Sequence, residues 1–561
     1  MRHRRGGSFV LVLVSLALIA AACGSSSKKS AGGGSSTTVA AKQGGDLVVS
    51  AEQEPQCLDW VGSCASAAWG RYTVEVNTMP GAYFFTSNSK FEATGLLTGE
   101  ATIVTSPKQV VTYKINPAAK WDDGQPITSH DFKYTWDQIA HGKDVFDQSG
   151  FKNIESVDDS KPDTAVVSFS TPYQDWKSLF GVSTYGVLPS HLLQGKDRAA
   201  AMTNGYTFSG GPWKLDHWTK GTEIKLVPNT AYWGKKPNLN SLTFKFLTDT
   251  ASEQAAFKSG QVSVMYPQAQ PGQEALKSVP NTSFDAVSGL SYEGLWFNTD
   301  KAPLNSKAVR QALAYATDRN AIVAQLFGPV QPDIKPIQAW YTPAFGAVYT
   351  NGGDPFGVYK LDLAKVTSLM TGDGFAKGAD GIWAKGGQKA TFELKTTTGN
   401  QRRLLTAQIL QSEWQTAGFG LTITTEKSGV LFGKDLPAGN FQIGLYAQTP
   451  SDNDPSECVI WCSDNIPTTA NGGNGENYTR LSDPNLDKNW KDVDSNPDQN
   501  ARVASAIAGQ KLLGDLIPAM PIDPFPDIIV ANSAVLGTET GTFKHDFAYG
   551  PYAYSNEWFI K

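Results

Sequence analysis

The sequence predicts a mixed α/β protein with two or more lobes. Its 561 residues are too many for a single hydrophobic core. Short stretches with the two-residue period of β-strands alternate with stretches in which apolar residues recur at helical spacing. The two kinds of stretch mix without a simple repeat, so we expect strands and helices to share the same lobes.

Alternating apolar residues predict the strands. Ordered structure is expected to begin at residues 46–49, Asp-Leu-Val-Val, which form a strand candidate. Further strands are expected at 166–170, 224–227 and 242–246, where apolar and polar residues alternate.

Capping residues and apolar spacing predict the helices. A turn at 121–126 precedes Thr128, which can cap a helix, and Asp131, whose carboxylate can reach back to the free amides. Asp318 can cap a later helix, and Gly418 can end another. The apolar residues at helical spacing are Phe132, Trp136 and Ile139, then Val309, Leu313 and Ala316, then Leu404, Ile409 and Trp414.

The first residues predict where the chain works. Arg2, Arg4 and Arg5 precede an apolar run, 9–22, which is too short to span a bilayer and stops at Cys23. This resembles a bacterial lipoprotein signal, and the resemblance implies that residues 1–22 are removed and that Cys23 is acylated. Its lipid would anchor the protein to the outer face of the cytoplasmic membrane. The alternative is an ordinary cleaved secretion signal.

Composition narrows the class of partner. Residues 23–45 are rich in Ser, Gly and Lys and are expected to form a flexible tether behind the lipid. The net charge of −5 gives no reason to expect nucleic acid as a partner. Aromatic residues make up 11% of the chain and include 15 Trp, which suits a large ligand cleft.

Cysteine spacing agrees with an oxidising cell envelope. With Cys23 assigned to lipid, four of the five cysteines remain, in two close pairs: Cys57 with Cys64, and Cys458 with Cys462. Local pairing as two disulfides is the simplest outcome. Four cysteines allow three connectivities, and the sequence does not choose among them.

Several blocks of sequence, in order, resemble the extracellular solute-binding proteins of the peptide/nickel class (family 5), which serve ABC importers and include oligopeptide- and dipeptide-binding lipoproteins. The strongest block is VTYKINPAAKWDDGQPITSHDFKYTWDQI at 111–139, and a second is LWFNTDKAPLNSKAVRQALAYATDRNAIV at 295–323. Other matching blocks lie at 44–60, 150–159, 166–176 and 210–247. The resemblance runs from about residue 44 to the C-terminus.

This resemblance implies a two-lobe periplasmic-binding-protein-like fold of type II, in its large cluster, with a hinge between the lobes and an additional inserted domain. Lobe I would combine residues 46–87, 186–290 and 521–561. The inserted domain would cover 88–185 and lobe II 291–520.

The ends of a bound peptide would need opposite charges, because an unpaired buried charge is costly. In peptide-binding relatives an Asp near an acidic-Pro pair holds the ligand ammonium, and here Asp452 or Asp454 matches. Arg402 stands where dipeptide-preferring relatives hold the ligand carboxylate, which an Arg can bind through two bonds. Each of these residues could instead belong to a turn or a helix start.

Aromatic residues complete the candidate site. Tyr292, Trp296 and Trp69 lie where relatives present the rim of a lobe or the cleft, and Tyr292 ranks first among them. A role in the hydrophobic core is the alternative for each.

The sequence lacks the motifs of the common enzyme and metal classes. The six His residues show no metal-ligand spacing, and neither a nucleophile elbow nor a Walker loop occurs, so no catalytic residue, metal or cofactor is expected. We expect a monomeric, non-enzymatic binding protein that delivers peptides to an ABC permease powered by a separate ATPase. The alternatives are the same fold with a non-peptide solute, such as a sugar, a haem-like ring or an opine-type metabolite, or a secreted hydrolase.

Overall fold

The computed structural model describes residues 39–561 apart from 66–68, 87–89, 182–184, 342–351, 449–456 and 545–549. The predicted leader, the predicted lipidation residue Cys23 and both candidate ammonium ligands, Asp452 and Asp454, lie outside the described residues. Within that described part, no helix combines the length and the apolar character needed to cross a membrane.

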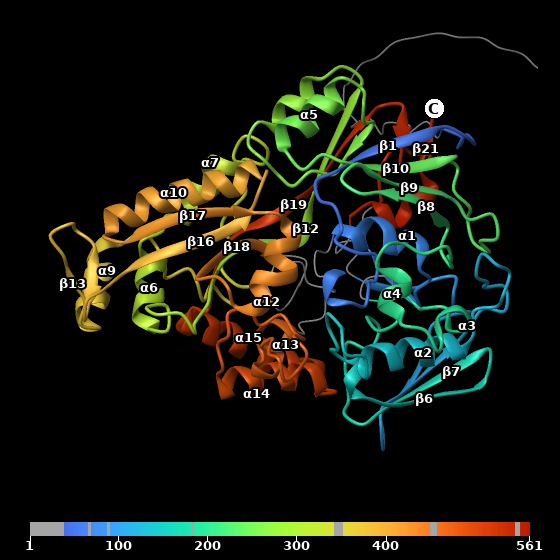
Figure 1. Cartoon of the computed structure of the whole chain (residues 1–561), viewed down its shortest axis with the longest axis horizontal. Coiled ribbons are helices and arrows are strands. Elements are labelled where there is room, and N and C mark those ends of the chain that lie inside the picture. The colour runs from blue at the N-terminus through green and yellow to red at the C-terminus, as the bar shows by residue number, and fades with distance from the viewer. Residues whose placement is uncertain are drawn as a thin grey trace, which may run out of the picture. The chain divides into compact units, whose positions relative to one another are not determined.

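A ten-stranded mixed sheet organises the described part of the chain, in the order β17-β16-β18-β12-β19-β11-β1-β10-β9-β8 (Figure 1). Its strands are β1 (Asp46–Ala51), β8 (Trp213–Thr219), β9 (Glu223–Pro228), β10 (Ser241–Phe246), β11 (Val264–Met265), β12 (Thr282–Phe297), β16 (Thr391–Thr397), β17 (Gly420–Glu426), β18 (Ile443–Gln448) and β19 (Ala519–Asn532).

The two long strands β12 and β19 join the two halves of this sheet. They run antiparallel side by side (Figure 1). At one end β12 pairs with β18 through residues 292–297, and at the other end β19 pairs with β11 at Val530 and Ala531. The register of β12 with β19 shifts between Ser288 and Tyr292 and again between Glu293 and Gly294. The shifts fall near the middle of β12.

Each half of the sheet contains a group of parallel strands. In one half β1 runs parallel to β10 and β11, and in the other β16 runs parallel to β17 and β18. The loops that follow the parallel strands of one group therefore leave the sheet along a common edge.

Four smaller sheets complete the β-structure of the described residues. A four-stranded sheet is ordered β4 (Thr102–Val104), β5 (Val110–Lys114), β7 (Thr164–Phe169) and β6 (Ile154–Lys161). The others pair β2 (Tyr83–Thr86) with β3 (Lys90–Ala93), β13 (Ala376–Lys377) with β14 (Trp383–Lys385) and β15 (Gln388–Lys389), and β20 (Val535–Leu536) with β21 (Phe559–Ile560).

The longer helices are α2 (Ser129–Ala140), α5 (Thr250–Lys258), α6 (Lys307–Tyr315), α7 (Arg319–Phe327), α9 (Leu363–Gly372), α10 (Gln401–Ala417), α14 (Pro484–Ser495) and α15 (Gln499–Leu516). The short ones are α1 (Val76–Thr78), α3 (Ser190–Leu193), α4 (Arg198–Met202), α11 (Ser428–Val430), α12 (Leu436–Ala438) and α13 (Cys458–Trp461). Helix α10 packs along β16 and β17 (Figure 1).

The predicted caps and strands are confirmed. Thr128 and Asp131 form a reciprocal capping box on α2, in which the Thr128 backbone N–H donates to Asp131 Oδ2 at 2.8 Å. Asp318 accepts a bond from the Ala321 N–H at the start of α7. Gly418 ends α10 in the left-handed conformation. The four predicted strands correspond to β1, β7, β9 and β10.

Both close cysteine pairs form disulfides in the structure. Cys57 is bonded to Cys64, and Cys458 to Cys462, with Cα–Cα distances of 5.8 and 4.8 Å. This is the local pairing, one of the three connectivities that the sequence allows.

Candidate functional site

A cavity of about 750 Å³ lies where strands of the ten-stranded sheet end. Its lining comes mainly from the loops after β1, β10 and β11 and from the β8–β9 hairpin in one half of the sheet, and from the loops after β16 and β17 in the other. In open α/β sheets, ligands bind outside the carboxyl ends of the strands, where loops vary without disturbing the core. The volume lies within the range of small-ligand pockets, about 300–1,000 Å³.

The two halves approach each other closely at Gly399, in the loop between β16 and α10. A Cβ atom at this position would lie 2.1 Å from the Thr248 carbonyl oxygen, and the φ angle is +86°. Both the contact and the backbone conformation favour glycine. This glycine therefore lets the loop after β16 touch the loop after β10 beside the cavity.

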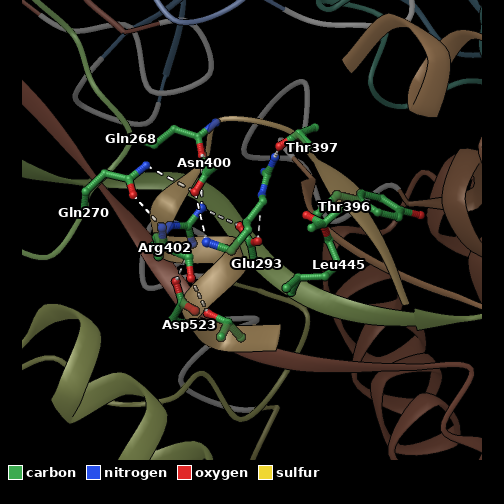
Figure 2. A network of polar contacts seen from close by, with 12 residues as sticks. Gln268, Gln270, Glu293, Thr396, Thr397, Asn400, Arg402, Leu445 and Asp523 are labelled. Atoms are coloured by element: carbon green, nitrogen blue, oxygen red, sulfur yellow. Dashed lines mark hydrogen bonds and ion pairs between the residues drawn. The ribbon is translucent and has the colours of Figure 1, made fainter. Parts of the chain in front are cut away.

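Three amide side chains bond the two halves together (Figure 2). Asn400 Nδ2 donates to Gln268 Oε1 at 2.6 Å, and Gln270 Nε2 donates to Asn400 Oδ1 at 3.2 Å. Gln270 Oε1 also accepts the backbone N–H of Arg402 at 2.7 Å, which satisfies an amide in the first turn of α10. The three side chains line the cavity and fix its wall.

A buried cluster of two arginines and two acids lies behind these amides (Figure 2). Arg402 is 1% exposed, and its Nη2 donates to Glu293 Oε2 at 2.7 Å and to Gln268 Oε1 at 3.0 Å. Arg403 Nε donates to Glu293 Oε1 at 2.8 Å. Asp523 Oδ2 lies 3.6 Å from Arg402 Nη1. Since Glu293 and Asp523 are paired across β12 and β19, the cluster joins α10 to both long strands.

The two acids of the cluster have opposite pKa shifts. Burial alone would raise the pKa of Glu293, but the guanidinium groups of Arg402 and Arg403 outweigh it and hold that pKa below its usual value. Burial raises the pKa of Asp523 well above its usual value, because its contact with Arg402 is longer and Glu293 is a like charge. The cluster thus holds two guanidinium charges against one firmly ionised carboxylate.

Three glutamates, Glu52, Glu54 and Glu253, line the cavity. Glu54 is well provided with donors, since its Oε1 accepts the indole N–H of Trp218 at 3.0 Å and the backbone N–H of Gly221 at 2.8 Å. It is therefore held as part of the wall.

The other two glutamates lie at the β1 side of the cavity. Glu52 Oε1 accepts Gln268 Nε2 at 2.8 Å, which connects it to the arginine cluster. Glu253 Oε1 accepts the Ser50 hydroxyl at 2.6 Å. Burial raises the pKa of Glu52, and it raises the pKa of Glu253 to about 8.

The structure places Arg402 in the buried cluster behind the cavity wall, where its guanidinium contacts Glu293, and not in the cavity lining. Direct contact with a ligand carboxylate would require this ion pair to rearrange. The predicted ammonium ligands Asp452 and Asp454 lie outside the described residues.

Tyr292 and Trp296 lie together in a buried aromatic cluster away from the cavity lining. Tyr292 O–H donates to Glu457 Oε1 at 3.4 Å, and its ring centroid lies 5.3 Å from that of Trp340. Trp296 stacks on Tyr446 at 5.1 Å and is 1% exposed. The structure therefore brings these two predicted residues together.

Trp69 lies elsewhere. It is 6% exposed, and its ring contacts Phe244 and Tyr552 at centroid distances of 5.9 and 6.1 Å.

Sequence reasoning missed the glutamates and amides of the cavity. Glu52 lies three residues beyond the predicted strand 46–49, and Asn400 lies two residues before Arg402, the possible helix start, so their positions near element ends were usable signals. Glu293 is the one charged residue in the otherwise apolar run GLSYEGLWF, and a lone charge in a buried strand implies a buried partner. No comparable local signal marks Glu253 or Gln268.

Comparisons with known proteins agree with this architecture. The oligopeptide-binding protein AppA of Bacillus subtilis is 27% identical over 467 residues, covering 81% of this chain and 82% of AppA. Among solved structures, AppA of Bacillus subtilis in complex with a nonapeptide matches with a TM-score of 0.83 at 20% identity, covering 93% of this chain and all of the other. The periplasmic EDTA-binding protein EppA matches with a TM-score of 0.80 at 20% identity, covering 93% and 98%.

These structural matches show the fold, which is the two-lobe type II α/β fold that the resemblance implies. The family model of the bacterial extracellular solute-binding proteins, family 5 Middle, matches residues 96–467, which is more than half of the chain. The chain belongs to the family 5 bacterial extracellular solute-binding proteins.

Proposed function

We propose that this protein captures peptides in the cavity at the strand ends and delivers them to an ABC permease that depends on a separate ATPase. The observation that carries the proposal is that loops from both halves of the ten-stranded sheet line one cavity. A ligand held there contacts both halves at once. Membership of the solute-binding family and similarity to an oligopeptide-binding protein support peptides as the ligand.

The mechanism follows from that two-sided lining. We take residues 46–87, 186–290 and 521–561 as lobe I, 291–520 as lobe II and 88–185 as an inserted domain. A ligand that contacts both lobes only when they are closed stabilises the closed state by its difference in affinity for the two states. The permease would then recognise the closed state.

In this proposal the arginine cluster binds the carboxylate end of the peptide, and Asp452 or Asp454 binds its ammonium end. Arg402 would act from behind the cavity wall through Gln268, whose amide it helps to orient, or directly after its ion pair with Glu293 rearranges. The aromatic residues Tyr292 and Trp296 would support the lobe II side.

We further propose that Cys23 carries lipid and holds the protein at the outer face of the cytoplasmic membrane, as a monomer. Cys23→Ala should release the protein from membranes without unfolding it, because the composition of residues 23–45 predicts a flexible tether. A variant that still sediments with membranes in high salt would contradict the anchor.

Native mass spectrometry of the protein as isolated tests the ligand. Peptides that co-purify, and that return intact after incubation with the protein, support a peptide-binding protein without enzymatic activity. Cleaved peptides would indicate a hydrolase.

A second candidate is a binding protein of the same fold that takes a non-peptide solute. The similarity to an EDTA-binding protein, at a TM-score of 0.80, supports this candidate because the same fold there accompanies a different ligand class. A co-purifying small molecule without peptides would support this candidate.

A further inference from the structure

The cavity is lined by more acidic than basic side chains. Glu52, Glu54 and Glu253 line it from the lobe I side, with Lys220 and Lys427 at exposed positions. Among the described residues, none of the three glutamates forms an ion pair. Lys220 is directed elsewhere, since its ammonium donates to Asn204 at 2.8 Å and lies over the Trp218 ring. The wall therefore carries an excess of acid groups.

Glu253 is the most deeply placed of these acids. It is 4% exposed, and its Oε1 accepts the Ser50 hydroxyl. No donor within the described part of the chain reaches its second oxygen, although the residue lines the cavity. A buried carboxyl with an unused oxygen at a cavity wall has room for a donor that the protein itself does not supply.

Among the described residues, the charged group that shifts the pKa of Glu253 is an acid, not a cation. It is the like charge of Glu52, from the loop after β1, and burial raises the Glu253 pKa to about 8. Tyr552, in η8 (Tyr552–Glu557), is fully buried, and burial together with the charges of Glu253 and Glu52 raises its pKa. Its hydroxyl has no hydrogen-bond partner within the described ranges. The guanidinium groups of Arg402 and Arg403 lower the pKa of Glu52 and do not reach Glu253.

We infer that the ligand carries an alkylammonium or guanidinium group that binds at Glu253 and Glu52, on the β1 side of the cavity. This inference rests on the proposed function, because it takes the cavity as the ligand site. It goes further by naming a cationic side chain, in addition to the peptide ends, as a feature that the protein selects.

Ligand binding would then release protons. At pH 7 the Glu253 carboxyl is mostly protonated, since its pKa is about 8. A cation placed beside it stabilises the ionised form, so the proton leaves as the ligand arrives. An uncharged ligand group in the same place has no such effect.

The test uses pentaalanine together with its single-Lys and single-Met variants at every position, titrated calorimetrically into the wild-type protein at pH 7. Lys and Met side chains are similar in length, so their comparison isolates the charge. We expect one Lys position to bind about tenfold tighter than the matching Met peptide. Titrations in phosphate and in Tris should show about one proton released with that Lys peptide and none with its Met partner.

Two variants locate the effect. Glu253→Gln keeps an acceptor for Ser50 and should bring the Lys and Met peptides within about twofold of each other. Glu75→Gln is the matched control, because Glu75 is also buried with a pKa raised by burial to about 8 but lies outside the cavity lining. This control should keep the Lys preference.

Met peptides that bind as tightly as Lys peptides at every position would overturn the inference, and so would a Lys preference that survives in Glu253→Gln. If no peptide binds, the peptide function fails separately. Cadaverine and 1-pentanol then decide the cation site by thermal stabilisation of the wild type. Stabilisation by cadaverine alone supports it, and equal effects of the two compounds overturn it.

Discussion

Two adjacent arginines hold one buried carboxylate from the same helix turn. Arg402 and Arg403 are both almost fully buried, and each donates to a different oxygen of Glu293. Charge-assisted bonds of this kind offset the high cost of burying the charged groups. They do so only while every partner of the ion pair is present. The cluster is therefore sensitive to the loss of any one member.

Arg402→Gln should lower the free energy of unfolding by about 3–5 kcal/mol, because Glu293 loses one of the two guanidinium groups that stabilise its buried charge and Gln268 Oε1 loses a donor. Urea denaturation measures the change. The control is Lys389→Gln, which breaks an exposed, solvent-screened ion pair with Asp380 and should change the free energy of unfolding far less. Equal losses in the two variants would contradict a stabilising role for the cluster.

At this scale the sequence offered Arg402 as a ligand contact or as a helix start, and it did not indicate the buried acids that Arg402 contacts. Its acid partner Glu293 lies 109 positions away, and Asp523 is farther still. The contact depends on how β12 and β19 are paired, and long-range pairing leaves no local trace in the sequence.

The short elements at the strand ends decide the shape of the cavity. The loop 397–400 is only a few residues long, yet it carries the cap of α10 at Asn400 and the close contact of Gly399 with Thr248. A rigid loop of this kind fixes the cavity wall before a ligand arrives.

Gly399→Ala should destabilise the protein by about 1–2 kcal/mol for the left-handed backbone and by about a further 1–3 kcal/mol for the overlap with Thr248. Gly387→Ala is the matched control, because Gly387 has a similar φ of +84° and a Cβ atom there would have no neighbour within 4 Å. Thermal denaturation of both variants, with ligand titration, separates the cost of the left-handed backbone from the cost of the overlap with Thr248. If Gly387→Ala is as destabilising as Gly399→Ala, the close contact contributes nothing.

The elements that were predicted have local signals. The capping box of α2, the Asp318 cap of α7 and the glycine that ends α10 are all written within a few residues. The length of β12 could not be predicted in this way. It remains extended over 16 residues because β18 and β19 supply hydrogen bonds along it, and these strands come from distant parts of the chain.

The whole molecule contains several carboxyls that burial makes hard to ionise. Burial raises the pKa of Glu75 and Glu253 to about 8, and that of Glu476 and Asp527 to about 7. In the unfolded chain such groups ionise at about pH 4–4.5. Between these values the folded state binds more protons than the unfolded state, so stability falls as pH rises.

We therefore expect the melting temperature to fall from pH 5 to pH 8. Each such group contributes up to about 1.4 kcal/mol per pH unit where its folded form is protonated and its unfolded form is ionised. Thermal melts at constant ionic strength measure how steeply the melting temperature falls with pH. Glu476→Gln should make this fall less steep by the contribution of one buried carboxyl. A melting temperature that rises from pH 5 to pH 8 would contradict the assignment.

The position of β19 between β12 and β11 also governs the order in which the chain can fold. Until residues 519–532 are available, the strands on either side of this position have no partner that connects them, and the ten-stranded sheet exists as two separate pieces. Within the ten-stranded sheet of the described residues, the ladder of strands that contains β1 connects to the other piece through β19. Closure of the sheet thus waits for the synthesis of residues 519–532, and a chain truncated before β19 keeps two unfinished sheet edges exposed to aggregation.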